Sequence, residues 1–400
     1  MGGPLYRRTG RDPVRRYTRR MPRASTTTLP GGMPAARFLA RHWQRRALLV
    51  RGAMPGFTGP LARRDLVRLA ARDDVESRLV VRTGTAFTLE HGPFRPADFR
   101  ALPARDWTLL VQGVNLVDRP SDTLLRRFAF VPYARLDDVM VSYAAPGGGV
   151  GPHVDSYDVF LLQGFGRRRW RWGAQKDHEM RPGVPVKILR RFRPTADAVL
   201  APGDMLYVPP GHAHDGVAVD ECTTWSIGFR APSGQELVDA FLDRLRDTLV
   251  VPGRHVDRAA RPARHPARLE PALLRTLARP VARIRWTTRD VERFLGAYLT
   301  EPKGHVTFDA PDPAWPAARF HAACARHGVA LDLRTQLLYD SRALYVNGAE
   351  VVAPAHARAT LHALADDRAL DARACRAAPA AALALLHDWY RHGYAHPGSG

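Results

Sequence analysis

The sequence predicts an α+β protein in which a barrel or sandwich of short strands is followed by helices and a small β-hairpin. Three observations support this prediction. Strand-like runs bounded by Gly, Pro or Asp recur from residue 78 to residue 229. At Ser233 the hydrophobic period changes from two residues to about 3.6, which marks the start of a helical segment. Near the C-terminus, Asn347-Gly348 lies between two β-like runs and predicts a hairpin with a type I′ turn.

The composition is that of a globular protein. The chain has 400 residues and is 45% hydrophobic, which is enough for one large core and one or two smaller domains. It contains no run of about eighteen uncharged apolar residues and no apolar signal-peptide core. Its three cysteines, Cys222, Cys324 and Cys375, are widely separated and fit a reducing compartment. The sequence therefore predicts a cytoplasmic protein that has no membrane span.

Positive charge is concentrated at the N-terminus. Sixty Lys and Arg against 39 Asp and Glu give a net charge of +21, which favours anionic partners and nucleic acid above all. Residues 1–24 hold eight arginines, so we expect 1–32 to form a basic, disordered tail. Two interpretations stay open: the tail is an electrostatic arm for RNA or the ribosome, or translation starts at Met21 or Met33.

The folded part is predicted to begin with a helix from Ala35, followed by strands. A turn of type II is expected at Pro202-Gly203, where it should join two antiparallel strands. The strand-like runs are 78–83, 107–116, 138–145, 157–164, 168–173, 197–200, 204–209 and 222–229.

Helical patterns dominate the chain after Ser233. Ser233 and Glu236 form a capping box, and a Pro- and Arg-rich stretch interrupts the helical pattern before it resumes. Helices around the predicted hairpin suggest a winged-helix-like module. The predicted elements are helices over 272–299, 314–327 and 379–391, and the predicted units are a strand-rich domain over 33–232, a helical connector or dimerisation region over 233–300 and a winged-helix-like domain over 301–400.

Two segments about sixty residues apart predict a metal site. His153 and Asp155 are two residues apart on a strand edge, so their side chains project from the same face. A third ligand from residues 203–214 would complete a set of two histidines and one carboxylate, which is typical of non-haem Fe(II) oxygenases. Gly203, Pro209, Gly211 and His214 match the second motif of cupin barrels, which favours His214 over His212 as that ligand.

Whether the site holds iron or zinc can be judged from whether the sequence also provides a cationic side chain that could bind a cosubstrate. Hydrolases also use zinc bound by two histidines and a carboxylate, whereas an oxygenase that uses 2-oxoglutarate needs a guanidinium for the distal carboxylate. In the run 166–172, strand alternation puts Arg168 on the same face as Trp170 and Trp172. An inward Arg168 without a partner predicts a bound anion. The alternative is a stripe of four arginines that binds nucleic acid, and Arg167, Arg169 and Arg171 remain candidates for an anionic partner.

Other residues near these segments are weaker candidates. Ser142 is expected to donate a hydroxyl to the cosubstrate carboxylate or to be an ordinary strand serine. Tyr157 and Asp158 are expected to contact a substrate, with packing and a turn ion pair as the alternatives. Residues 146–151 are glycine-rich but lack the Lys-Ser/Thr of a phosphate loop, so we expect a flexible approach to the metal strand.

The stretches 142–171, 202–216 and 226–232 resemble the bacterial ribosomal-oxygenase branch of the JmjC/cupin superfamily. The resemblance implies a double-stranded β-helix, a homodimer and an Fe(II)-, 2-oxoglutarate- and O₂-dependent hydroxylase of an arginine β-carbon in a large-subunit ribosomal protein, with possible contact to ribosomal RNA through basic regions. By motif position, His153, Asp155 and His214 would hold iron and Arg168 would bind 2-oxoglutarate. The alternatives are a JmjC-type hydroxylase or demethylase of another protein, and a nucleic-acid-binding protein with a vestigial cupin.

Overall fold

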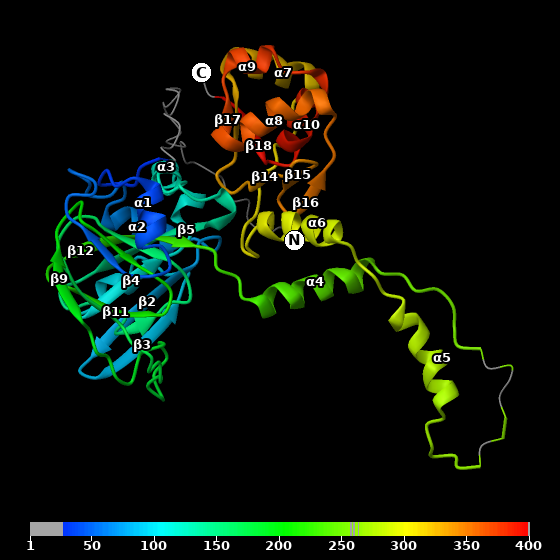
Figure 1. The fold of residues 1–400 in the computed structure, drawn as a ribbon. Coiled ribbons are helices and arrows are strands. Elements are labelled where there is room, and N and C mark those ends of the chain that lie inside the picture. The colour runs from blue at the N-terminus through cyan, green and yellow to red at the C-terminus, as the bar shows by residue number, and fades with distance from the viewer. Residues whose placement is uncertain (1–26, 257, 259–260, 263, 399–400) are drawn as a thin grey trace, which may run out of the picture.

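The computed structural model describes residues 27–256, 258, 261–262 and 264–398 (Figure 1). Most of the predicted basic tail, residues 1–26, lies outside the described residues. None of the described helices is long and apolar enough to cross a bilayer.

Two antiparallel sheets form the first half of the chain. The larger has the strand order β1-β10-β7-β12-β5-β4-β2-β3 and the smaller β6-β11-β8-β9, which confirms the predicted double-stranded β-helix. The larger sheet contains β1 Leu48–Val50, β2 Ser77–Thr83, β3 Ala86–His91, β4 Trp107–Val111, β5 Leu136–Ala144, β7 Val159–Gln163, β10 Met205–Val208 and β12 Cys222–Phe229. The smaller contains β6 His153–Val154, β8 Arg168–Ala174, β9 Ala196–Leu200 and β11 His212–Ala218.

Strand alternation gives the larger sheet two different apolar faces. On its outer face Phe160 and Tyr207 pack on Phe38 from the first helix, with ring centroids 5.4 and 4.9 Å from that of Phe38. On its inner face lie Leu161 and Leu206, which belong to a cluster shared with Trp170 and Leu200 of the smaller sheet. The helices packed outside the larger sheet are α1 Ala35–Arg41, α2 Arg63–Ala70 and α3 Arg119–Arg126.

The prediction for the turn at Pro202-Gly203 is wrong in one respect. The turn exists, because Asp204 N–H donates to the Ala201 carbonyl at 2.9 Å and Gly203 has φ +85°. The strands on either side do not pair, since β9 belongs to the smaller sheet and β10 to the larger. Turn residues determine a local reversal of the chain. Which strand each flanking strand pairs with depends on strands that are distant in sequence.

The predicted strand over 107–116 is also too long. It ends at Val111, because Gly113 takes a left-handed conformation with φ +63° and a short 3₁₀ turn, Val114–Leu116, follows. Two further 3₁₀ turns occur at Asp98–Arg100 and Tyr133–Arg135.

Helices and a small β unit form the second half of the chain. The capping box is confirmed, since Glu236 N–H donates to Ser233 Oγ at 3.1 Å at the start of a helix. The predicted helix over 272–299 is two helices separated by a break. The type I′ turn is confirmed by φ values of +48° and +89° at Asn347 and Gly348. The helices are α4 Gly234–Thr248, α5 Pro271–Ala282, α6 Thr288–Thr300, α7 Ala317–His327, α8 Ala355–Asp367, α9 Ala372–Arg376 and α10 Ala380–Arg391, and the strands are β13 Val329–Leu331, β14 Leu337–Tyr339, β15 Leu344–Val346, β16 Ala349–Val351, β17 Ala369–Leu370 and β18 Ala395–Pro397.

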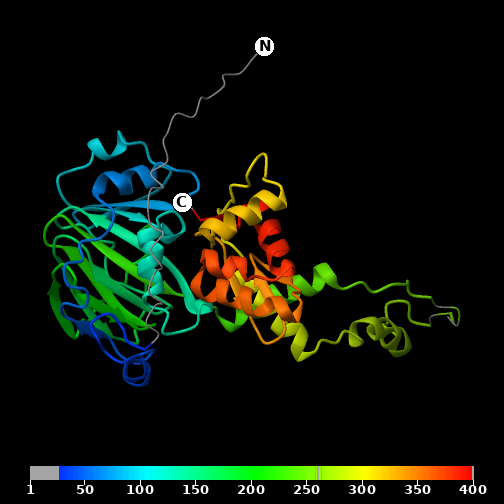
Figure 2. The ribbon, with the colours of Figure 1, turned by 90° about the horizontal axis from the view of Figure 1, so that it is seen from above.

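Polar contacts join the barrel to the residues that follow α5, among them the hydrogen bond from Tyr133 Oη to the Asp366 carbonyl at 3.0 Å. Lys303 Nζ lies 3.2 Å from Asp137 Oδ1 and 3.3 Å from Asp138 Oδ2, both on β5. Arg230 donates to the Leu299 carbonyl at 2.7 Å. In contrast, α5 and the loop beside it extend away from the rest of the chain in both views (Figures 1 and 2).

Candidate metal centre

Two strands of the smaller sheet bring the predicted histidines together. His153 on β6 is the direct cross-strand partner of His214 on β11. Opposite residues of an antiparallel pair project to the same side, so both rings face the interior between the sheets. Asp155 follows directly after β6, which is only two residues long.

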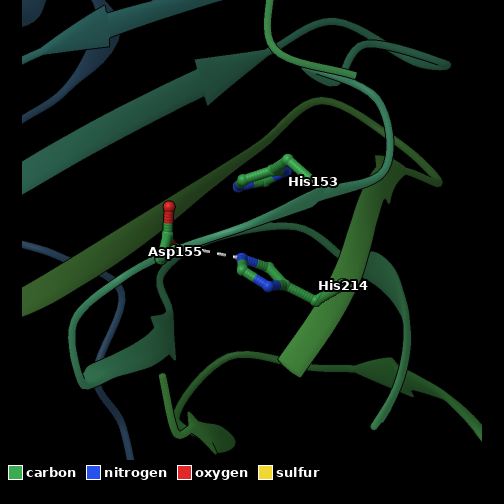
Figure 3. A group of neighbouring side chains, drawn as sticks. All are labelled: His153, Asp155 and His214. Carbon is green, nitrogen blue, oxygen red and sulfur yellow. Dashed lines mark ion pairs between the residues drawn. The ribbon is translucent and has the colours of Figure 1, made fainter. Parts of the chain in front are cut away.

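The three side chains form a compact donor group (Figure 3). One possible ligand atom from each of His153, Asp155 and His214 lies within 4.8 Å of the other two. His214 Nε2 lies 3.5 Å from Asp155 Oδ2, and the two imidazole centroids are 4.2 Å apart. Among the described residues this is the one group of at least three such side chains that could hold an ion.

Hydrogen bonds to the backbone set the orientation of both rings. His153 Nδ1 lies 2.9 Å from the Gly151 carbonyl and His214 Nδ1 lies 3.1 Å from the His212 carbonyl. A carbonyl only accepts, so each Nδ1 carries the proton and donates. The lone pair is therefore on Nε2, which is the arrangement expected of imidazoles that bind a metal.

The protonation equilibria fit a cation site. Burial lowers the pKa of His214 well below its ordinary value, and the neighbouring His153 acts in the same direction, so His214 stays neutral as a ligand must. Burial raises the pKa of Asp155 despite the opposing effect of His153 and Arg78. A bound cation would offset the cost of keeping that carboxylate charged, so the donor set fits a divalent metal.

His212 lies outside this group. It is only half-buried, and its contribution to the site is the carbonyl that orients the His214 ring. The structure thus groups His214, and not His212, with His153 and Asp155.

Arg168 is buried and has no hydrogen-bond or ion-pair partner among the described residues. Only 4% of it is exposed, and neither Nε nor one terminal nitrogen forms a hydrogen bond with any described residue. Its guanidinium carbon lies 5.8 Å from the Trp170 ring centroid. Because a buried charge without a counter-ion is costly, this cation is expected to bind an anion. A dicarboxylate cosubstrate fits that requirement.

The guanidinium and the metal ligands share one face of the smaller sheet. Register pairs His214 with Trp172, Gly216 with Trp170 and Ala218 with Arg168. On this shared face, the metal ligand His214 lies at one end and the cation Arg168 lies about 13 Å farther along the strands. Gly216 leaves the space that the Trp170 ring occupies, since a Cβ there would lie 2.6 Å from the ring.

The other arginines of this run, Arg167 directly before β8 and Arg169 and Arg171 on it, face outward and are ion-paired. Arg167 lies 2.8 Å from Asp220, Arg171 lies 2.5 Å from Asp215, and Arg169 pairs with Asp197. Each positive charge on this face thus has a carboxylate partner within the protein. The arrangement does not favour the four-arginine stripe as a nucleic-acid surface.

Ser142 belongs to a polar patch on the inner face of the larger sheet. It is the cross-strand partner of Thr224, which in turn is opposite Gln163, and all three are buried. Thr224 Oγ1 donates to Gln163 Oε1 at 3.2 Å. Sequence reasoning missed Gln163 and Thr224 because their shared face depends on the pairing of three distant strands.

For Asp158 the structure favours the alternative of packing and ion pairing over contact with a substrate. Asp158 is fully buried and accepts hydrogen bonds from Tyr207 Oη at 2.6 Å and Gln44 Nε2 at 3.0 Å. Its carboxylate, directly before β7, therefore connects this strand to β10 and to the N-terminal segment, and it lies 3.7 Å from Arg135 Nη2. Tyr157, by contrast, is 40% exposed, so its ring is available to another molecule.

The glycine-rich approach to β6 is tightly packed, and the prediction of a flexible segment is wrong. A Cβ at Gly148 would lie 2.1 Å from the Trp107 carbonyl oxygen, and one at Gly149 would lie 2.5 Å from that of Gly216. Gly148 also accepts a hydrogen bond from Ala218 N–H at 2.9 Å. The glycines allow this segment to lie directly against β11.

Comparisons with known proteins agree with this geometry. A JmjC domain family model matches residues 123–237, and a ROXA-like winged-helix model matches residues 283–396. The chain is 34% identical over 337 residues to the ribosomal protein uL16 3-hydroxylase of Escherichia coli, covering 84% of this chain and 89% of the relative. It is 38% identical over 215 residues to a probable ribosomal oxygenase of Haemophilus influenzae, covering 53% of each chain.

Solved structures of the E. coli ribosomal oxygenase YcfD share the fold. One matches with a TM-score of 0.78 and 31% identity, covering 90% of this chain and 97% of the other. Another, in complex with cobalt and 2-oxoglutarate, matches with a TM-score of 0.76 and 32% identity, covering the same shares. The JmjC fold, the donor group and these relatives together show that the chain is an Fe(II)- and 2-oxoglutarate-dependent oxygenase and belongs to the ribosomal-oxygenase family.

Proposed function

We propose that this enzyme hydroxylates the β-carbon of an arginine in ribosomal protein uL16. The observation that carries the proposal is the match to the E. coli uL16 3-hydroxylase over 89% of that protein. Three relatives whose names include demethylase and histidyl-hydroxylase activity match less than half of this chain, two at 26% identity over 46% of it and one at 39% identity over 18% of it. The site is also complete, with three metal donors and an unpaired buried guanidinium, which a vestigial barrel would not need to keep.

We propose specific roles for the residues of the site. His153, Asp155 and His214 would hold Fe(II), and their placement on one side leaves positions for cosubstrate and O₂. When bound, iron and 2-oxoglutarate supply the oxidising chemistry.

Other residues would bind and position the two substrates. The Arg168 guanidinium would bind the distal carboxylate of 2-oxoglutarate, with the Ser142 hydroxyl as a second donor on the facing sheet. The exposed Tyr157 ring would contact the substrate peptide close to Asp155. The protein's contribution is to orient the target C–H bond and exclude water around it.

Mass spectrometry tests the proposal directly. The purified enzyme is incubated with Fe(II), 2-oxoglutarate and ribosomal proteins from cells that lack this gene. We expect a mass gain of one oxygen on uL16, located by fragmentation to an arginine, and formation of an equal amount of succinate. The gain appearing on a histidine, or on another protein alone, would contradict the proposed substrate. The matched control is Asp155→Ala, which removes a metal donor.

We also propose that the enzyme is a cytoplasmic homodimer and that the helical segment 233–300 mediates its pairing. Apolar side chains of α4 and α5 are exposed in the single chain, among them Leu242, Leu274 and Leu277, which are 51%, 47% and 47% exposed. In the proposed division of the chain, 33–232 catalyses and 301–400 is the winged-helix unit. Light scattering of Leu274→Glu with Leu277→Glu should show a monomer where the wild type shows a dimer.

Contact with ribosomal RNA through basic regions is a further part of this proposal. Residues 1–26 lie outside the described residues. The outward arginines at 167, 169 and 171 are neutralised by carboxylates. Some exposed arginines, those of α5 among them, have no carboxylate partner among the described residues.

A further inference from the structure

Helix α5 separates charge and apolar side chains onto opposite faces. Arg275, Arg279 and Arg283 follow one another at intervals of four residues, the last at the C-terminal cap. At 100° per residue they lie on the side of the helix away from Leu277 and Val281. A rise of 1.5 Å per residue puts successive arginines about 6 Å apart along this face.

These three arginines have no carboxylate partner among the described residues. No ion pair or side-chain hydrogen bond joins Arg275, Arg279 or Arg283 to another described residue, and all three are exposed. The outward arginines at 167, 169 and 171 each pair with an aspartate. An unpaired row of exposed guanidinium groups creates a local positive field that attracts anions.

The chain around α5 extends this field. Residues 252–285 contain nine arginines and two acidic residues, Asp257 and Glu270. Glu270 lies 3.9 Å from Arg268, and Asp257 lies outside the described residues. No residue of α5 is buried, so this helix is accessible to a large partner. Besides the row on α5, the arginines of this segment are Arg254, Arg258, Arg261, Arg264, Arg268 and Arg285.

We propose that the row formed by Arg275, Arg279 and Arg283 binds the phosphate backbone of RNA. Guanidinium groups bind phosphate oxygens bidentately, and a regular row of them suits a polymer of phosphates better than an isolated anion. The choice of RNA rests on the proposed function, because the enzyme would encounter a ribosomal-protein substrate close to ribosomal RNA. The apolar face of α5 stays available for the second copy of the chain, so the two surfaces do not compete.

Fluorescence anisotropy with a labelled RNA stem-loop tests this inference. The full-length enzyme is compared with a variant that carries Arg275→Gln, Arg279→Gln and Arg283→Gln. We expect the affinity to fall on the order of tenfold or more at low salt, and the slope of log K against log salt to fall by about two to three. The control carries Arg326→Gln, Arg342→Gln and Arg391→Gln, three exposed winged-helix arginines that also have no described ion pair, and it should bind RNA as the wild type does.

Several results would overturn the inference. An unchanged affinity and salt slope in the α5 variant would do so, and so would an equal loss in the winged-helix variant. The same variants are tested on vesicles of phosphatidylglycerol, because basic amphipathic helices also bind anionic lipid. If the α5 variant lost vesicle binding and kept RNA binding, the surface would be a lipid site and the inference would be wrong.

Hydroxylation of a short uL16 peptide separates this inference from the proposed function. The peptide carries no RNA, so the α5 variant should hydroxylate it at the wild-type rate and remain a dimer by light scattering. If no enzyme form hydroxylates the peptide while the α5 variant still loses RNA binding, the proposed substrate fails and the RNA site stands.

Discussion

The two arginine-rich regions of this enzyme, strand β8 and helix α5, use the same residue for different purposes. In β8 a period of two sends Arg168 inward and its arginine neighbours outward, where each meets an aspartate. In α5 a period of four residues puts Arg275, Arg279 and Arg283 on one exposed face without partners. Burial and pairing, and not the number of arginines, therefore indicate which cations stabilise the fold and which are available to bind an anion.

Replacing the buried arginine should have the largest effect. Arg168→Met keeps the volume and removes the charge, so we expect the KM for 2-oxoglutarate to rise by on the order of a hundredfold or more. The fold should be kept or become more stable, because an unpaired buried cation is lost. Steady-state succinate formation and thermal unfolding measure both effects. Arg169→Met on the outward face is the control, and an equal loss of 2-oxoglutarate binding there would contradict the assignment.

Sequence reasoning could separate Arg168 from its neighbours because strand alternation and two tryptophans are local signals. It could not find the partners of the outward arginines, because Asp197, Asp215 and Asp220 come from β9, β11 and the loop that follows β11. It could not decide between the two interpretations of Asp158 for the same reason, since the partner Tyr207 lies 49 residues away in sequence. Periodicity predicts the face on which a side chain lies, whereas strand pairing decides what that side chain meets.

An outward arginine with a buried partner should matter for stability rather than catalysis. Arg171 pairs with Asp215, whose side chain is 4% exposed, so Arg171→Met leaves a buried carboxylate without a partner. We expect a loss of about 2–3 kcal/mol in the free energy of unfolding, measured with urea. Arg169→Met is the matched control: its pair with Asp197 is exposed, with side chains 58% and 40% accessible, and should contribute far less to the free energy of unfolding. Equal losses in both variants would mean that burial of the partner is not the cause.

The close packing of Trp170 against Gly216 can be tested by adding a single methyl group at Gly216. A Cβ at Gly216 would lie 2.6 Å from the buried Trp170 ring, so Gly216→Ala should destabilise the protein by about 1–3 kcal/mol and weaken 2-oxoglutarate binding by displacing Trp170. Thermal unfolding and the KM for 2-oxoglutarate are the measurements. Gly234→Ala, where the added Cβ has no neighbour within 4 Å, should leave both unchanged. Normal stability in Gly216→Ala would show that the ring can move.

The buried carboxylate of Asp155 should make the stability of the metal-free enzyme depend on pH. Burial raises the pKa of Asp155 in the folded protein above its ordinary value of 3.8. At a pH between 3.8 and this raised pKa, Asp155 is therefore protonated in the folded protein and ionised in the unfolded chain. The free energy of unfolding of the metal-free enzyme should therefore fall as the pH rises through this range. Over the same range, the Asp155→Asn variant should become increasingly more stable than the wild type. Urea unfolding of both proteins across this range is the measurement. Adding Co²⁺ should stabilise only the wild type, and a pH-independent difference would contradict the sign.

The smallest effect on stability is expected on α5, which completes the contrast with β8. Arg275, Arg279 and Arg283 neither pair with a carboxylate nor cover a buried surface in the described chain, so changing all three to Gln should shift the free energy of unfolding by less than about 0.5 kcal/mol. Arginine and glutamine have similar helix propensities, so the helix should persist. Urea unfolding beside Arg171→Met provides the comparison. A loss on α5 as large as that on β8 would mean that these arginines stabilise the protein, and the distinction between paired and unpaired arginines would fail.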